Sequence, residues 1–358
     1  MRRALFIAGV LVVGAGVIGA WIWASLYLPY QGFAAPGVYV DIPKGASRRT
    51  IAGLLASQGV IRSRWAFEAL SRRESRRTLQ AGEYFFNRPE TGLEVFDTLA
   101  EGRVFVKELV VPEGYSMFDI ADLVAKEGFL SREDFLAAAR DASAVRDLAP
   151  NAQTTEGFLF PATYGFPRHP TGEQMVGAMV KRFRQEWTTI AAEPSDPPGR
   201  PLEQTLTLAS LVERETPKPD ERPLVAGVFT NRLEKKMPLQ CDPTVVYALE
   251  LSGQYNGTLD AKDLPFESLY NTYRHAGLPP GPIANPGEAS LRAALAPAKT
   301  DYLYFVANTE GGHFFSKTLE EHNRNVVKYR KLLAAERNAA RFPATAPTPS
   351  SARAHVGP

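Results

Sequence analysis

The pattern of apolar and polar positions separates one unbroken apolar run near the N-terminus from a long stretch of mixed periodicity. Residues 4–28 contain no charged side chain and are apolar apart from Ser25. About 20 apolar residues are enough to span a bilayer, so this run predicts a transmembrane helix. Arg2 and Arg3 precede the run, and aromatic residues gather at its far end. These are Trp21, Trp23, Tyr27 and Tyr30.

The flanks of this run predict how it lies in the membrane. Basic residues favour the cytoplasmic side and aromatic residues the interfaces, so residues 1–3 are expected in the cytoplasm and the rest of the chain outside. A cleaved signal peptide has a shorter apolar core and a small-x-small cleavage site, which residues 34–36 (Ala-Ala-Pro) match poorly. We therefore expect an uncleaved anchor over residues 4–28, followed by a linker over residues 29–40.

An alternative reading of the same segment is a dinucleotide-binding turn. Residues 14–19 read Gly-Ala-Gly-Val-Ile-Gly, and Asp41 follows at a distance that suits a ribose-binding acid. A Rossmann helix needs a solvent-facing side, however, and residues 16–28 supply no charge for one. Because Gly and Ala are also common in membrane helices, the anchor remains the preferred interpretation.

An internal repeat follows the anchor. Residues 42–61 and 111–130 align without a gap, and eight of the twenty positions are identical. Similarity of this kind predicts a duplicated supersecondary unit. Each copy predicts a short strand, a Pro-x-Gly turn and a helix that a serine caps and a glycine ends. The caps are Ser47 and Ser116, with Asp119 completing a box-like pair in the second copy, and the ending glycines are Gly59 and Gly128.

The first copy continues into a complete small domain. The pattern predicts a second helix over residues 63–77, strands over 82–86 and 104–106, and a helix over 93–101. The turn Val40-x-x-Pro43-x-Gly45-x-Ser47 resembles that of a LysM-like module, which implies peptidoglycan binding over residues 41–107. A spacer domain that binds nothing is the alternative. The second copy predicts a repeat-like α+β subdomain over residues 108–150, half a module leading into the next domain.

The candidate chemistry lies in the third part of the chain, residues 151–335. An aromatic segment at 155–164 and helices over 171–190 and 202–215 are predicted there. Leu202, Leu206, Ala209 and Glu213 share one helix face, so Glu213 extends a buried stripe, while Glu215 lies about 200° around. Burial raises the pKa of a carboxyl group, and cleaving a glycosidic bond requires a protonated acid. An ion pair of Glu213 with Arg214 or Arg222 is the alternative.

Ordered motifs across this region resemble the YceG-like family of membrane-anchored endolytic murein transglycosylases. Residues 209–216 read Ala-Ser-Leu-Val-Glu-Arg-Glu-Thr, the segment that carries the catalytic glutamate in that family. Residues 156–164 read Glu-Gly-Phe-Leu-Phe-Pro-Ala-Thr-Tyr, a second family segment. The resemblance covers nearly the whole chain. Further motifs lie at residues 228–233, 237–245, 270–273, 277–287, 302–306, 311–316 and 322–323.

The resemblance implies the reaction and assigns its residues. The enzyme would cut the β-1,4 bond between N-acetylmuramic acid and N-acetylglucosamine within glycan strands, leave 1,6-anhydro ends, and terminate or trim nascent strands. The resemblance assigns the catalytic acid to Glu213, with Glu215 as the fallback acid. A turn or packing role would explain each candidate substrate-binding residue equally well. These candidates are Glu156, Gln240, Asp242, Tyr270, Asn271 and Thr272.

Two other functions remain open from the sequence. A muramidase-type hydrolase would use Glu213 as the acid with Glu215 or Glu156 as the second carboxylate. A non-catalytic peptidoglycan-binding scaffold of the wall-synthesis machinery would not depend on Glu213. The first would produce reducing ends, and the second would produce no new ends at all.

Composition and the resemblance together set the remaining expectations. The 358 residues suit about two domains, and 44% hydrophobic with 22% charged residues is typical of a folded α+β protein. The net charge of +2 gives no excess for nucleic acid. One cysteine and five histidines without a His-x-x-x-His pair predict no metal or other cofactor.

The expected partners are peptidoglycan glycan strands and the membrane, with peptidoglycan synthases as further candidates. The expected location is the bacterial inner membrane, with a single pass and a periplasmic catalytic domain. The Pro-rich residues 336–358 predict a disordered tail.

Overall fold

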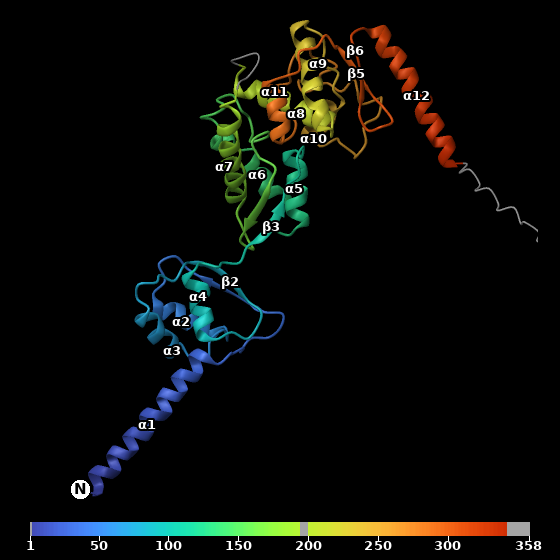
Figure 1. Cartoon of the computed structure of the whole chain (residues 1–358). Coiled ribbons are helices and arrows are strands. Elements are labelled where there is room, and N and C mark those ends of the chain that lie inside the picture. The colour runs from blue at the N-terminus through green and yellow to red at the C-terminus, as the bar shows by residue number, and fades with distance from the viewer. Residues whose placement is uncertain (1, 194–199, 342–358) are drawn as a thin grey trace, which may run out of the picture. The chain divides into compact units, whose positions relative to one another are not determined.

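The computed structural model describes residues 2–193 and 200–341, which form a mixed α and β protein in two compact units (Figure 1). Unit 1 comprises Met1–Glu108 and Gly165–His169. Unit 2 comprises Leu109–Tyr164 and Pro170–Pro358. A short segment from later in the chain therefore belongs to the first unit.

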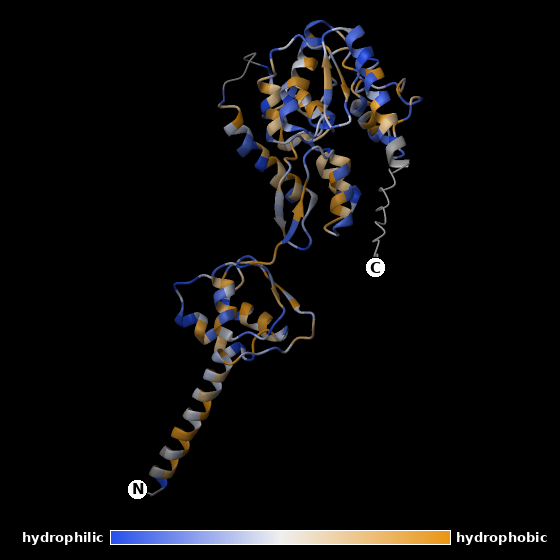
Figure 2. Ribbon diagram, turned by 45° about the vertical axis from the view of Figure 1, so that its right-hand side comes forward, coloured by the Kyte–Doolittle hydropathy of each residue, from blue (hydrophilic) through white to orange (hydrophobic). Residues whose placement is uncertain are grey.

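Unit 1 begins with the predicted apolar helix, α1 (Arg2–Tyr27). Its Gly9–Tyr27 portion is long and apolar enough to cross a membrane, a property that signal sequences share. Figure 2 shows α1 in white and orange along most of its length, and large side chains such as Leu11 and Val12 are exposed on it. Exposed apolar surface of this extent is typical of a segment that contacts lipid or another protein.

The rest of unit 1 has the predicted strand–helix–helix–strand order. The strands β1 and β2 pair antiparallel, from Val38 opposite Phe86 to Ile42 opposite Gly82. The LysM-like character of this unit stays a prediction. The elements are β1 (Val38–Ile42), α2 (Arg48–Ser57), α3 (Arg64–Arg73), β2 (Gly82–Phe86) and α4 (Gly92–Ala100).

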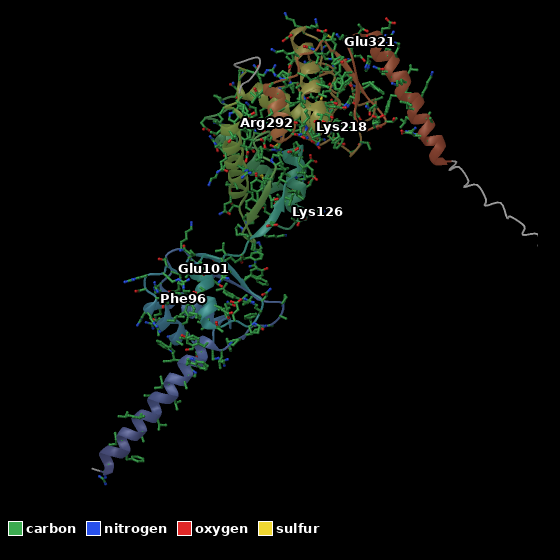
Figure 3. The ribbon with its side chains drawn as sticks, viewed as in Figure 1. Phe96, Glu101, Lys126, Lys218, Arg292 and Glu321 are labelled. Carbon is green, nitrogen blue, oxygen red and sulfur yellow. The ribbon has the colours of Figure 1, made fainter. Side chains whose placement is uncertain are left out.

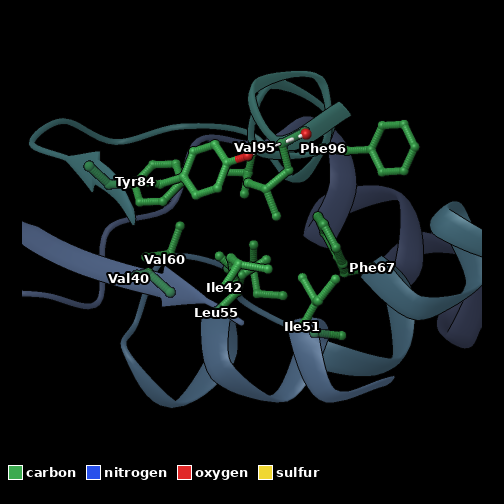
Figure 4. Packing of buried hydrophobic residues seen from close by; sticks show 13 residues of the cluster. Val40, Ile42, Ile51, Leu55, Val60, Phe67, Tyr84, Val95 and Phe96 are labelled. Carbon is green, nitrogen blue, oxygen red and sulfur yellow. Dashed lines mark hydrogen bonds between the residues drawn. The ribbon is translucent and has the colours of Figure 1, made fainter. Parts of the chain in front are cut away.

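One hydrophobic core holds unit 1 together (Figure 4). Alternate strand residues such as Val40 and Tyr84 point into it, because successive side chains of a strand face opposite ways. Figure 4 shows Leu55 of α2 and Phe67 of α3 meeting these strand residues from the helical side. The rings of Phe67 and Phe96 lie 6.1 Å apart and close the core beside α4.

The second copy of the repeat is also a complete strand–helix–helix–strand unit. Its strands pair with one another, although the second of them lies beyond residue 150, outside the subdomain predicted from the sequence. A long insertion between the second helix and this strand hides the match in the sequence. The elements are β3 (Lys107–Val110), α5 (Met117–Lys126), α6 (Arg132–Ala139) and β4 (Thr163–Phe166).

The strand predicted over residues 104–106 is wrong, since the strand begins at Lys107. The Phe105 backbone N–H donates one hydrogen bond to the Glu83 carbonyl over 2.7 Å. The Phe105 ring packs edge-on against Tyr39, with 5.1 Å between ring centroids. Aromatic packing therefore accounts for the apolar character of this segment, which forms no ladder.

The predicted helix caps are confirmed in both copies. The Ser47 hydroxyl accepts a hydrogen bond from the Thr50 N–H, and Ser116 and Asp119 form a reciprocal capping box. Gly59 and Gly128 follow their helices with φ of 71° each, in the left-handed region that suits glycine.

In unit 2, α9, α10 and α11 pack against α8, which is buried on all sides from Thr205 to Val212. The structure confirms the two helices predicted near residues 171–190 and 202–215. The elements are η1 (Ala142–Ala144), α7 (Gly172–Ile190), α8 (Leu202–Glu215), η2 (Pro219–Glu221), α9 (Arg222–Glu234), α10 (Asp242–Ser252), α11 (Glu288–Leu295), β5 (Tyr304–Ala307), β6 (His313–Ser316) and α12 (Leu319–Arg341).

The last helix, α12, continues through residues 336–341, where the sequence analysis begins the tail. This stretch is rich in Ala, Glu and Arg, which have high helix propensity, and Pro343 follows it. The rest of the predicted tail, residues 342–358, lies outside the described residues.

Candidate active site

An open cleft of about 440 Å³ lies in unit 2 at the C-terminal end of α8. Three segments build it: the turn between β3 and α5, the last turn of α8 with the two residues after it, and the first residue of α9. Acidic and basic side chains contribute four of the eight lining residues, and the cleft is accessible from solvent. The lining residues are Glu113, Gly114, Tyr115, Glu213, Arg214, Thr216, Pro217 and Arg222.

The carboxyl group of Glu213 lies at the inner wall of this cleft, with only 4% of its side chain exposed. Arg222 donates a hydrogen bond from Nη2 to Oε1 over 2.8 Å. The Gly287 backbone N–H donates to Oε2 over 2.9 Å. Each oxygen is thus held by a different element, α9 on one side and the start of α11 on the other, which fixes the orientation of the acid.

Burial raises the pKa of Glu213 above its usual range, as the sequence analysis predicted. The Gly287 N–H and the Arg222 guanidinium oppose this shift because both stabilise the ionised form. The nearby Glu113 carboxylate reinforces it because like charges repel. The net effect favours a protonated acid, which is the form that can donate a proton.

Arg222 is shared between two carboxylates. Its Nη2 lies 3.3 Å from Glu113 Oε2 as well as 2.8 Å from Glu213 Oε1, and only 7% of the side chain is exposed. Glu113 is 49% exposed. Arg214, the other partner considered for Glu213, instead donates to the Gly114 carbonyl over 3.0 Å. The ion pair between Glu213 and Arg222, the alternative considered from the sequence, is therefore present, and it lies within the cleft.

Gly287 provides the space in which Glu113 lies. A Cβ atom at this position would lie 2.0 Å from Glu113 Oε1, far inside contact distance. Gly287 therefore donates a hydrogen bond to Glu213 from its N–H, and its lack of a side chain leaves room for the Glu113 carboxyl.

Asn285 fixes the turn that carries Glu113. Its Nδ2 donates to the Tyr115 carbonyl over 2.9 Å and to Glu156 Oε1 over 2.8 Å, and its Oδ1 accepts from the Leu159 N–H over 2.8 Å. The Gly114 N–H donates to the Asn285 carbonyl over 2.9 Å. One fully buried amide thus joins three segments that are far apart in the sequence.

Glu156 lies behind this turn and is only 2% exposed. Burial raises its pKa to about 8, although the Met117 N–H donates to its Oε2 over 2.9 Å and lowers it in part. Glu156 and Tyr270 line a separate cavity of about 50 Å³. The structure therefore brings these two predicted residues together, but at a smaller cavity than the cleft that contains Glu213.

Two further predicted residues are buried in the turn before residue 273. The Asn271 amide donates to the Leu264 and Phe266 carbonyls over 2.9 and 2.7 Å. The Thr272 hydroxyl accepts from the Cys241 N–H over 3.0 Å. Both side chains are engaged in holding backbone, which leaves a substrate contact for either of them as a prediction.

Gln240 and Asp242 are exposed at the start of α10. Gln240 has a φ of 51°, in the left-handed region, and the Tyr273 hydroxyl donates to Asp242. Glu215 also faces this region. Burial raises its pKa, and a hydrogen bond with the Cys241 thiol lowers it in part. Of the predicted acids, Glu213 is therefore the one that the structure places in the open cleft.

Glu113 was not expected from the sequence, the roles of Asn285 and Gly287 within the motif at residues 277–287 were not, and Arg222 was expected only as an ion-pair partner. One signal for Glu113 is visible in the repeat. The first copy has Lys44 in the Pro-x-Gly turn where the second has Glu113, so the charge is reversed at an otherwise similar turn. Gly287 ends the motif at residues 277–287, but the motif does not reveal its role, because that role depends on a side chain far away in the sequence.

The sequence and the fold are similar to those of known proteins. The sequence matches the YceG-like family over residues 40–328. It is 37% identical to the endolytic murein transglycosylase of Bacillus subtilis, covering 89% of this chain and 91% of that protein. It is 30% identical to the endolytic murein transglycosylase of Streptococcus pneumoniae serotype 2, covering 89% of this chain and 63% of that protein. The crystal structure of a putative yceG-like protein from Listeria monocytogenes superposes with a TM-score of 0.53 at 35% identity, covering 81% of this chain and 99% of that one.

Proposed function

The chain belongs to the YceG-like family, and we propose that it is an endolytic murein transglycosylase that leaves 1,6-anhydro ends. The observation that carries this proposal is the Glu213 carboxyl, held by two donors and 4% exposed in an open cleft. The relatives from Bacillus subtilis and Streptococcus pneumoniae are endolytic murein transglycosylases, which supports murein glycan as the substrate.

The first step breaks the glycosidic bond. Glu213 gives its proton to the oxygen that leaves C1 of N-acetylmuramic acid, and the C1–O bond breaks toward an oxocarbenium-like state. Burial favours the protonated form of Glu213 before the reaction. Arg222 and the Gly287 N–H then stabilise the carboxylate that remains, because both donate to its oxygens.

The second step closes the product ring. The 6-hydroxyl of the same muramoyl residue attacks C1, the C1–O6 bond forms, and the hydroxyl proton passes to the Glu213 carboxylate. No water is consumed, and Glu213 regains the proton that it gave away. Because the nucleophile is part of the substrate, the reaction needs no second carboxylate to activate water.

The N-terminal helix fits the same function. We propose that α1 anchors the enzyme in the bacterial inner membrane, with the N-terminus in the cytoplasm and unit 2 in the periplasm, where it terminates or trims nascent strands. The length and apolar composition of Gly9–Tyr27 support the anchor, and the preceding Arg2 and Arg3 support its orientation. The strand–helix–helix–strand order of unit 1 supports a LysM-like module that grips glycan.

The test uses the full chain in detergent micelles and polymeric peptidoglycan. We expect released muropeptides whose ends are lighter by one water than reducing ends, as mass spectrometry measures. Glu213→Gln should lower the rate by about 100- to 10,000-fold, the usual contribution of general acid catalysis. Glu215→Gln, two positions away, is the matched control and should retain substantial activity.

Other products would overturn the proposal. Reducing ends would identify a hydrolase, and a dependence on a second carboxylate would accompany them. Glycan binding without release of ends, by a folded wild-type chain, would identify a scaffold. Equal activity of wild type and Glu213→Gln would remove Glu213 from the mechanism.

A further inference from the structure

Two carboxylates compete for one guanidinium in the cleft. Arg222 Nη2 lies 2.8 Å from Glu213 Oε1 and 3.3 Å from Glu113 Oε2. If both acids are ionised, the three groups carry a net charge of −1, and Arg222 compensates only one of the two. Uptake of a single proton makes the group neutral, so the question is which carboxylate holds it.

Exposure decides where the proton lies. Water reaches Glu113, whose side chain is 49% exposed, and stabilises its ionised form. Glu213 is 4% exposed and loses most of that stabilisation. Ionisation is therefore more costly for Glu213 than for Glu113, so a single proton taken up by this group favours Glu213.

We propose that Glu113 is a positioning residue that favours the protonated form of Glu213, by its own negative charge and by sharing the Arg222 guanidinium with Glu213. The inference rests on the proposed function and deepens it, because it names the group that prepares the general acid. Glu113 acts through Arg222 and through space, and it needs no bond to the substrate.

The other groups around Glu213 leave this role to Glu113. The Arg222 guanidinium comes from α9, the Gly287 N–H from the residue before α11, and the buried Ser290 hydroxyl from α11. All three groups favour the ionised form of Glu213. Among the described residues around Glu213, the charged group that favours its protonated form is Glu113. Burial of Glu213 acts in the same direction.

The position of Glu113 depends on Gly287. A Cβ at residue 287 would overlap the Glu113 carboxyl, which lies 2.0 Å from it at Oε1, whereas the Gly287 φ of −78° suits alanine. Gly287→Ala therefore displaces Glu113 without removing its charge and keeps the backbone N–H that holds Glu213. Two independent variants therefore weaken the effect of Glu113 on Glu213. Glu113→Gln removes the charge, and Gly287→Ala displaces it.

The experiment measures the pH dependence of kcat/KM for release of glycan ends by the full chain. Glu113→Gln should move the alkaline limb to lower pH by about one unit, because a neighbouring like charge raises the pKa of an acid by this order. The ratio of wild-type to variant rates should be near one on the acidic side and rise to roughly tenfold on the alkaline side. Gly287→Ala should shift the limb in the same direction.

The control is Glu288→Gln, one residue further on. Glu288 is exposed and accepts from Arg292 of its own helix, the residue labelled in Figure 3. This variant should keep the wild-type profile. A parallel drop at every pH in Glu113→Gln and Gly287→Ala, or unchanged profiles in both, would overturn the inference.

The outcome separates this inference from the proposed function. The products of the wild-type chain decide the function whatever the variants do. Anhydro ends with an unmoved alkaline limb would reject the role of Glu113 alone. If Glu113→Gln does not fold, Gly287→Ala still tests the role, since its backbone conformation is allowed.

Discussion

Arg222 reaches back from the first residue of α9 to Glu213 near the end of α8, and its Nη2 donates to Oε1 over 2.8 Å. Both side chains are buried, at 7% and 4% exposure. Removing one partner of a buried ion pair costs far more than the pair adds to stability, because the other charge loses its compensation. The pair therefore ties the stability of this end of α8 to the protonation of Glu213.

Replacing Arg222 by methionine tests this relationship. Arg222→Met removes the charge but keeps most of the apolar volume, and it should lower stability by about 3 kcal/mol at pH 8. The loss should be smaller at pH 5, because without Arg222 the pKa of Glu213 rises further and its protonated form carries no charge. Urea denaturation at both pH values measures this difference. Arg214→Met, at a side chain 35% exposed, is the control and should cost about 1 kcal/mol or less. Equal losses at the two pH values would contradict the argument.

Replacing Glu156 by glutamine tests its raised pKa. In the folded state Glu156 keeps its proton up to about pH 8, whereas in the unfolded chain it loses the proton near pH 4.5. The contribution of protonated Glu156 to the free energy of unfolding is therefore complete below pH 4.5. It falls as the pH rises toward 8, by up to about 1.4 kcal/mol per pH unit. Glu156→Gln resembles the protonated form and should make this slope shallower in denaturation curves between pH 5 and 8. The same pH dependence of stability in Glu156→Gln and wild type would show that Glu156 does not hold the proton responsible for it.

Replacing Asn285 by alanine tests how the cleft turn is held. Asn285→Ala leaves the buried Leu159 N–H without its acceptor and the Tyr115 carbonyl without its side-chain donor, and should cost about 2–4 kcal/mol. Because the turn carries Glu113, it should also lower activity at temperatures where the chain remains folded. Asn231→Ala is the control, since its amide donates to the Thr300 and Tyr302 carbonyls away from the cleft. A loss of activity equal in both variants would deny Asn285 a specific role.

Replacing Leu55 by alanine tests the independence of the two units. Leu55 is fully buried in the unit 1 core, so Leu55→Ala should cost about 2–5 kcal/mol. Hydrogen exchange followed by mass spectrometry should show faster exchange in unit 1 peptides and unchanged exchange in unit 2. Leu54→Ala, at its partly buried neighbour, should have a smaller effect. Faster exchange throughout both units would show that they unfold together.

Local features of this protein were predictable from its sequence because their causes lie within a few residues. The boundaries of α7 and α8, the Ser116–Asp119 capping box and the burial of Glu213 follow from periodicity and capping, which act over one or two helical turns. The apolar helix α1 follows from composition alone. The strand predicted over residues 104–106 was wrong because apolar character does not reveal whether a segment finds a strand partner.

The arrangement of the cleft was decided by the tertiary structure. Glu113, Arg222 and Gly287 come from three segments separated by tens to more than a hundred positions, and no periodicity links them. Packing of α9 and α11 around α8 brings Arg222 and the Gly287 N–H to the two oxygens of one carboxyl, and the missing Cβ of Gly287 admits a second carboxyl beside them. The sequence predicted Glu213 as the acid, through the family motif at residues 209–216. Long-range packing determined its hydrogen-bond donors and its competing charge, because electrostatic effects depend on distances and burial that exist only in the folded chain.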